Sequence, residues 1–322
     1  MRKVLGVLEF TESLYCAADS LGKTTSISFA GIKGKLTLPS LPEFGENEAH
    51  PLNKPLLGPE PARTWKRGDE LLYWGKPVSY PEVTASVELA LLEFSLELDN
   101  YDASTQKIYN SSGEWLRIFE DYVKLITKQG TRNIVFSNDM PGNLELIFCE
   151  GAKFEPVSNN SSTYISVEMS SDDMSLHFDQ YENAAKLASQ FLQPGLQYRM
   201  LLESYGARKR EDYRKAIIEA ASALEVCLTM RIKEEFNAQG ISFGEKLLQK
   251  FRMLGGRFEL ASLLGINLPD KDYKSLILNP RNNVIHRAEF PDKGLANQVI
   301  NEVEELLYLL TPQLCEDGVI VQ

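Results

Sequence analysis

The residues best suited to chemistry in this 322-residue chain lie together in the segment Arg281-Asn282-Asn283-Val284-Ile285-His286. Histidine titrates near neutral pH, so its imidazole can take up or release a proton during a reaction. A guanidinium holds a phosphate through two parallel hydrogen bonds and offsets charge in a transition state. An imidazole, a guanidinium and side-chain amides in one short segment therefore suit cleavage of a phosphodiester bond.

The residues just before this segment predict the start of a helix. Asn279 is a good N-cap, and Pro280 suits the first helical position. On such a helix His286 would lie directly above Asn282, four residues earlier. Arg281 would lie about 140° away around the helix axis, but its long side chain could reach the same cleft. The N-terminus of the helix would itself favour a phosphate.

Metal and thiol chemistry have little support in the rest of the sequence. The other histidines, His50 and His177, have no Cys or acidic residues at metal-ligand spacing, so we expect no zinc site. No glycine-rich phosphate loop or nucleophile elbow occurs. Four cysteines without a Cys-x-x-Cys pair predict reduced thiols and a cytoplasmic protein. We therefore expect a site that uses neither a metal nor a cofactor.

The charge of the chain is unevenly distributed. Of the net charge of −11, residues 1–180 account for −10, with 16 Lys and Arg against 26 Asp and Glu. Residues 181–322 are nearly balanced, with 18 against 19. This excludes a salt-driven, high-affinity duplex binder, but it leaves room for a local basic face in the second part. No run of 18 apolar residues predicts a membrane span.

Periodicity divides the chain into two predicted domains with an α+β fold class overall. Residues 1–180 alternate polar and apolar residues in several short stretches, which predicts a β-rich, sandwich-like domain. Two of these stretches, residues 25–29 and 33–38, predict a hairpin around Gly31 and Gly34. One helix, over residues 111–129, is expected to pack on this domain, with Ser111 or Ser112 as its cap. The role of this N-terminal domain is left open, with sensing or regulation as possibilities.

Residues 181–322 predict an all-helical bundle of five to seven helices. The longest, over residues 212–236, carries an apolar stripe at helical spacing. Shorter helices are expected on either side of Gly255-Gly256, and the last helix is expected over residues 293–310. Asn279-Pro280 is expected to interrupt the helical segment that contains the motif.

The order of these features resembles the HEPN superfamily. Ribonucleases of that superfamily carry an Arg, four to six further residues and then a His, often with a polar residue directly after the Arg. Arg281, Asn282, the four-residue gap and His286 match this pattern. The resemblance covers roughly residues 195–311, and the layout is similar to that of prokaryotic abortive-infection and antiviral defence proteins, which implies a toxin or a defence effector.

The resemblance implies RNA cleavage without a metal ion, by attack of the ribose 2′-hydroxyl on the adjacent phosphate. It implies that His286 acts as general acid or base, that Arg281 binds the scissile phosphate and that Asn282 orients one of them. The site in such proteins is commonly formed by two paired domains, so a homodimer acting on an RNA substrate is implied. Glu219 or Glu225, on the long helix, would be available to orient His286.

Three alternatives remain open at this point. The motif could belong to a non-catalytic HEPN module that binds a nucleotide or a protein. His286 could also be a structural histidine, and Arg281 could form a surface ion pair with Asp270, Asp272 or Glu289. The N-terminal domain could bind a ligand or glycan, with the helices serving only to dimerise; three tryptophans exposed on one face would favour this. The basic runs at residues 208–210 and 214–215 could face RNA or form a solvated helix surface.

Overall fold

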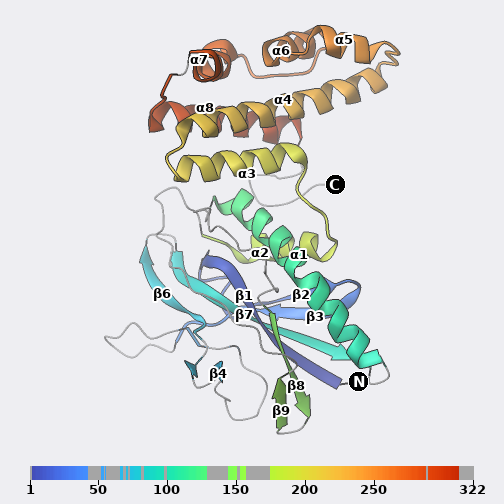
Figure 1. Cartoon of the computed structure of the whole chain (residues 1–322), viewed down its shortest axis with the longest axis vertical. Helices are drawn as coiled ribbons and strands as arrows, with labels where there is room; N and C mark the ends of the chain where they lie inside the picture. Colours follow the sequence, from blue (N-terminus) through green and yellow to red (C-terminus); the bar gives the residue numbers. More distant parts are fainter. Residues whose placement is uncertain are drawn as a thin grey trace. The chain divides into compact units, whose positions relative to one another are not determined.

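The computed structural model describes residues 2–42, 52–53, 55, 66–67, 70–71, 73–80, 83–97, 100–128, 144–150, 153–156, 175–287 and 289–311. The chain forms two compact units. Unit 1 comprises residues 1–130 and 134–193, and unit 2 comprises residues 131–133 and 194–322. The fold is mixed α+β, with an antiparallel sheet in the N-terminal part and helices after it (Figure 1).

Seven strands of unit 1 form one antiparallel sheet in the order β2-β3-β7-β1-β8-β9, with β6 also paired to β7. The two longest strands, β1 and β7, form its centre, so the stretch from residue 83 is one strand. A separate two-stranded ribbon joins β4 to β5. The strands are β1 Arg2–Cys16, β2 Thr24–Phe29, β3 Ile32–Thr37, β4 Lys66–Arg67, β5 Glu70–Leu71, β6 Gly75–Tyr80, β7 Val83–Leu96, β8 Leu144–Glu150 and β9 Lys153–Pro156.

Two helices, α1 (Tyr101–Thr127) and α2 (Phe178–Ser189), pack against this sheet (Figure 1). The ring of Trp115 lies 5.2 Å from those of both Phe29 and Phe119, and its indole N–H donates to Ser189 Oγ at 3.2 Å. The Tyr181 hydroxyl donates to the carbonyl of Leu36. In place of the expected sandwich of two sheets, the described residues form this seven-stranded sheet and the short β4–β5 ribbon, and the helices α1 and α2 pack against the larger sheet.

Helix α1 begins ten residues earlier than the capping pattern predicts, after Asn100. Ser111 and Ser112 lie inside the helix and do not cap it. Their hydroxyls donate to carbonyls three and four residues back, which satisfies them without ending the helix. The predicted end of the helix agrees within two residues.

The boundary between the two units lies after Gln193, not at residue 180. The reason is the packing of α2, which we expected to open the helical domain. Tyr181, Ala184, Ala185 and Ala188 are fully buried, and the Ser189 hydroxyl accepts the backbone N–H of Ser28 at 2.9 Å. Helix α2 therefore completes the core of unit 1.

A buried carboxyl lies beside the irregular stretch of β1. The ladder between β1 and β7 shifts register between Glu9 and Leu14. Inside this shift, the backbone N–H of Thr11 donates to Glu120 Oε1 at 2.6 Å. Glu12 pairs with Lys124 at 3.6 Å on the same side. Burial raises the pKa of Glu120 from its usual 4.5 to about 7, and the positive charge of Lys124 only partly opposes this.

Unit 1 is expected to lose stability as the pH rises from about 5 to 8. Because the folded pKa of Glu120 lies above its unfolded value, the folded state holds the proton more tightly between these limits. Glu120→Gln keeps an oxygen for the Thr11 N–H and removes the titration. We expect the variant to be more stable than the wild type at pH 8 by on the order of 1–3 kcal/mol, and its urea midpoint to vary less with pH. An unchanged pH dependence in the variant would contradict this assignment.

The described residues of unit 2 are all helices and connecting loops (Figure 1). Helix α8 lies where the sequence predicts it, and its Asp292 cap accepts the N–H of Leu295 at 2.8 Å. Gly255-Gly256 lies inside α6 and does not separate two helices. The helices are α3 Leu196–Lys209, α4 Tyr213–Ala238, α5 Gly244–Lys250, α6 Leu254–Leu263, a π-helical turn Lys274–Leu278, α7 Asn279–His286 and α8 Lys293–Leu310.

Helices α3, α4 and α8 pack together around one apolar core. Its fully buried members include Leu201, Ile217, Leu224, Val303 and Leu307. These side chains recur at helical spacing, which explains why periodicity locates the three helices well. None of the described helices is both long and apolar enough to cross a bilayer.

Candidate functional site

The motif lies on α7, which continues directly from the π-helical turn at residues 274–278. Leu278 and Asn279 both have helical backbone angles. Pro280 has no N–H to donate, and its ring would clash with a carbonyl four residues back in a regular α-helix. The wider π turn just before Pro280 accommodates both effects, so the chain stays helical through the proline.

Helix α7 begins at Asn279, one residue from the predicted cap, but the residues before it are already helical, so Asn279 does not cap a free helix end. The N–H of Asn279 donates to the carbonyl of Lys274. The helical segment instead begins near Asp272, whose carboxylate accepts the N–H and hydroxyl of Ser275 at 3.2 and 2.6 Å. An acidic residue already occupies that end of the segment, so a free helix N-terminus does not contribute a phosphate site beside the motif.

Arg281 and Asn282 lie together on the surface of α7. The Arg281 guanidinium donates to Asn282 Oδ1 at 3.1 Å, so the amide orients the guanidinium. Asn282 is exposed and Arg281 is partly exposed. The ion pairs with Asp270, Asp272 or Glu289 that would make Arg281 purely structural do not occur among the described residues, and the guanidinium remains accessible.

His286 is the last residue of α7 and is exposed to solvent. Within the described part of the chain, no hydrogen bond joins it to Arg281, Asn282, Glu219 or Glu225. The helix therefore presents the imidazole and the guanidinium as separate accessible groups. A bound phosphate or a second chain would have to bring them to the same reacting atoms.

Arg214, on the first turn of α4, is the residue that the fold brings to the motif helix. Its guanidinium donates to the carbonyl of Val284 at 3.2 Å, near the C-terminal end of α7. The same guanidinium lies 5.4 Å from the centre of the Phe290 ring. A cation at the C-terminal end of a helix also stabilises the helix dipole. Arg214 thus fixes the turn that carries His286.

Arg214→Ala is expected to loosen the end of α7. The variant loses a charge-assisted hydrogen bond, so we expect its free energy of unfolding to fall by about 1–2 kcal/mol. The N–H groups of Arg287 and Glu289, which both donate to the carbonyl of Asn283, should exchange faster with deuterium. Lys215→Ala is the matched control because, in the described part of the chain, the Lys215 side chain pairs with Glu203 on α3 and makes no hydrogen bond or ion pair with α7. Equal exchange rates in the two variants would contradict the role of Arg214.

The other basic run, residues 208–210 at the end of α3, does not form one exposed basic face. Arg208 is buried; it donates to Asn297 on α8 at 3.3 Å and lies 6.0 Å from the ring of Tyr205. Two of the three tryptophans of unit 1 lie in its core. Trp74 and Trp115 are only 5% and 0% exposed, which argues against a tryptophan-lined ligand face, and Trp65 lies outside the described residues.

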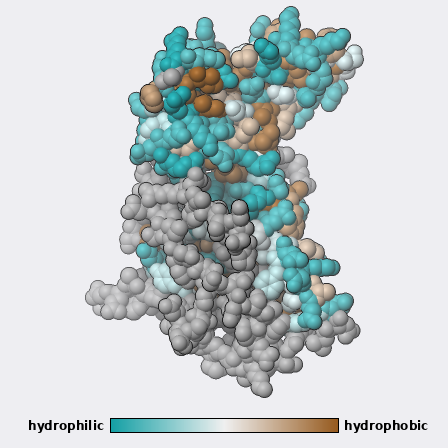
Figure 2. All heavy atoms as spheres, viewed as in Figure 1, coloured by the Kyte–Doolittle hydropathy of each residue, from teal (hydrophilic) through white to brown (hydrophobic). Residues whose placement is uncertain are grey.

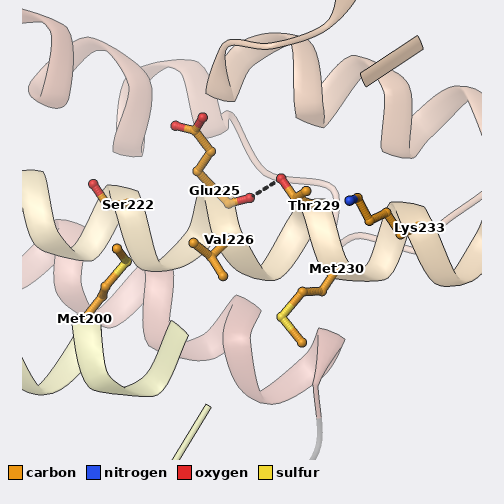
Figure 3. A pocket seen from close by; sticks show the side chains of 7 residues that line it. All are labelled: Met200, Ser222, Glu225, Val226, Thr229, Met230 and Lys233. Carbon is orange, nitrogen blue, oxygen red and sulfur yellow. Dashed lines mark hydrogen bonds between the residues drawn. The ribbon is translucent and has the colours of Figure 1, made fainter. Parts of the chain in front are cut away.

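A groove of about 410 Å³ runs along α4 on another part of unit 2 (Figure 3). Met200, Val226 and Met230 lie along its apolar side, whereas Glu225 points away from them in the view. The Thr229 hydroxyl is satisfied by the carbonyl of Glu225. None of the motif residues lines this groove, so it is not the cleft that the motif chemistry requires.

The thiols of Cys16 and Cys227 are not suited to act as nucleophiles. Burial raises the pKa of both Cys16 and Cys227 to about 12, so each remains a protonated thiol at neutral pH. Among the residues that the structure describes, no three His, Cys, Asp or Glu side chains gather in the way a metal ion requires. The motif on α7 remains the strongest candidate.

Sequence reasoning missed Phe290 and the contact made by Arg214. Arg214 carries a weak signal, because it belongs to a basic run, but nothing in the local pattern places it against a segment 70 residues later. No protein-family model, curated protein or solved structure matches this chain, so the role of the site rests on its own residues.

Proposed function

We propose that this chain is a metal-independent endoribonuclease of the HEPN type. His286 moves a proton, Arg281 binds the scissile phosphate and offsets its charge, and Asn282 orients the guanidinium. The ribose 2′-hydroxyl attacks the adjacent phosphorus, the bond to the 5′-oxygen of the next nucleotide breaks, and a 2′,3′-cyclic phosphate forms. The 2′-hydroxyl proton is taken up by one base, and the leaving 5′-oxygen receives a proton from an acid.

One observation carries this proposal: a short helix presents an exposed imidazole and a partly exposed guanidinium held by an amide. Structural histidines and arginines usually have partners within the fold. His286 has no hydrogen-bond partner among the described residues, and Arg281 has only Asn282. Both groups are therefore available to bind a phosphodiester.

A homodimer fits this arrangement. Acid and base must act on opposite sides of the reacting phosphate, and each chain supplies one His286. Two motifs paired across a two-fold axis would provide both roles and two guanidiniums. In the proposed role as a toxin or antiviral defence effector, the acidic unit 1 restrains or triggers cleavage by unit 2.

The proposal is tested by incubating the purified protein with total RNA and with tRNA in the presence of EDTA. We expect new RNA fragments whose amount grows with protein concentration. The His286→Ala variant should not produce these fragments under the same conditions. Intact RNA at high protein concentration in several preparations would count against the nuclease. RNA or nucleotide binding that depends on Arg281 and His286, without fragments, would favour the non-catalytic binding module.

A further inference from the structure

Phe290 is an aromatic side chain placed in solvent beside the motif. It is 86% exposed, which makes it the most exposed large hydrophobic residue among those described. It follows His286 by four residues, so the two Cα atoms lie within about 14 Å whatever path the chain takes. Burying a phenylalanine is worth about 1.5–3 kcal/mol, so leaving this ring in water has a cost. Figure 2 shows that the visible face of unit 2 is mostly hydrophilic, with a few hydrophobic residues among the polar ones.

Single exposed hydrophobic residues are common and need no explanation by themselves. Phe290 differs because its ring is held from one side by the guanidinium of Arg214, at 5.4 Å from the ring centre. Arg214 is in turn bound to the carbonyl of Val284 on the motif helix. The ring is therefore held by a contact to the same turn that carries His286, and does not hang freely from a loop.

The charges around the ring favour a polyanion over an apolar protein surface as its partner. Arg214, Arg287 and Arg281 lie within or against this segment, and Arg287 is exposed. Among the acidic residues nearby, Asp292 caps α8 and Asp212 caps α4. Glu211 and Glu289 are the remaining opposing charges, and both are exposed. An aromatic ring backed by a guanidinium and flanked by further cations is the arrangement on which unpaired bases stack.

We propose that the Arg214–Phe290 pair is a stacking platform for an unpaired nucleobase next to the scissile phosphate. This rests on the proposed function and specifies its substrate class as single-stranded or looped RNA. Bases in a duplex are already stacked and cannot lie on a protein ring. Because every base has a π-face, the platform selects for an unpaired strand and has little preference among the four bases.

The test separates binding from cleavage. The affinity of the full-length protein is measured by fluorescence anisotropy with a labelled 2′-O-methyl oligonucleotide, which cannot be cleaved by 2′-hydroxyl attack. A second oligonucleotide of the same length carries abasic residues, which keep the phosphates and remove the bases. The variants are Phe290→Ala, Phe290→Trp and the control Leu263→Ala, whose side chain is 70% exposed on α6.

We expect Phe290→Ala to weaken binding of the normal oligonucleotide about 5- to 100-fold. Phe290→Trp should bind at least as well as the wild type, and Leu263→Ala should be unchanged. With the abasic oligonucleotide, Phe290→Ala and the wild type should bind alike.

Equal affinity of Phe290→Ala and the wild type for the normal oligonucleotide would overturn the platform, as would an equal loss with both oligonucleotides. A variant that changes only the association of two chains would show that Phe290 contacts protein and would also overturn it. Cleavage in EDTA is measured separately. If the protein cleaves RNA but Phe290→Ala does not weaken oligonucleotide binding, the platform is rejected and the nuclease stands. If Phe290→Ala weakens binding but the protein does not cleave RNA, the nuclease is rejected and the platform stands.

Discussion

Replacing His286 with alanine is expected to slow RNA cleavage about 100- to 10,000-fold, because the reaction loses the group that moves the proton. If two copies of His286 serve one site as acid and base, the loss should lie toward the upper end of this range. Cleavage is measured as the initial rate of fragmentation of one defined oligonucleotide in EDTA. The affinity for an uncleavable oligonucleotide should change much less than the rate, because in this proposal Arg281 supplies the contact to the phosphate.

His177→Ala is the matched control for this variant. His177 is also exposed, but it lies in unit 1, where its ring nitrogen is 3.3 Å from the carboxylate of Asp19. We expect His177→Ala to cleave at the wild-type rate. Equal activity of the His286→Ala and wild-type proteins would show that the imidazole is not part of the reaction. Equal losses in the two histidine variants would indicate damage to the fold.

Replacing Trp115 with alanine is expected to have the largest effect on folding, a loss of about 3–5 kcal/mol in unit 1. Trp115 is fully buried, stacks on Phe119 with an interplanar angle of 8° and bonds to Ser189 on α2. The substitution leaves a cavity where α1, α2 and β2 meet and removes the indole N–H bond to Ser189, whose hydroxyl keeps its bonds to Ser28 and Ala185. This is a large fraction of the stability of an ordinary domain.

Hydrogen exchange measured by mass spectrometry reports this loss in each unit. Peptides from β1 and β7 should lose protection in Trp115→Ala, whereas peptides from α4 should not. Tyr73→Ala, at a residue that is 41% exposed, should change protection little. Unchanged protection of β1 and β7 in Trp115→Ala would contradict the central position of this side chain in the core of unit 1.

The elements predicted well are those whose ends are set by local chemistry. Helix α8 has a strong apolar stripe and an Asp292 cap, and the hairpin of β2 and β3 turns through Ala30-Gly31. Both turn residues have positive φ values, 49° and 86°, as the tight turns between paired strands require. Such features depend on a few neighbouring residues, so a sequence pattern is enough to find them.

The errors occur where packing or an irregular backbone geometry overrides the usual meaning of a Gly, a Pro or a capping residue. Gly256 lies inside α6 and does not end the helix. A Cβ atom at this position would come within 3.1 Å of the backbone of Phe251, so the glycine allows the two segments to approach closely. Pro280 lies inside a helical segment because a π turn makes room for its ring. Helix α2 joins unit 1 because its alanine-rich face matches the sheet and α1.

In the candidate site, too, the local features can be predicted from the sequence and the tertiary contacts cannot. The types and spacing of Arg281, Asn282 and His286 are visible in the sequence, because the motif is short and continuous. The contacts of Arg214 with Val284 and Phe290 are not, because they depend on how α4 meets the segment after α7. Residue identity therefore predicts the chemistry, whereas the supporting contacts come from the tertiary fold.

The most direct test of the account is the chemistry of the RNA ends that the protein produces in EDTA. An oligonucleotide cut at one mapped position is compared with the same oligonucleotide that carries a single 2′-deoxyribose on the 5′ side of that position. The account predicts a 2′,3′-cyclic phosphate and a 5′-hydroxyl in the first case and no cut at that position in the second. A 5′-phosphate product, or cleavage of the deoxy-substituted bond at the same rate, would contradict 2′-hydroxyl attack at the motif on α7.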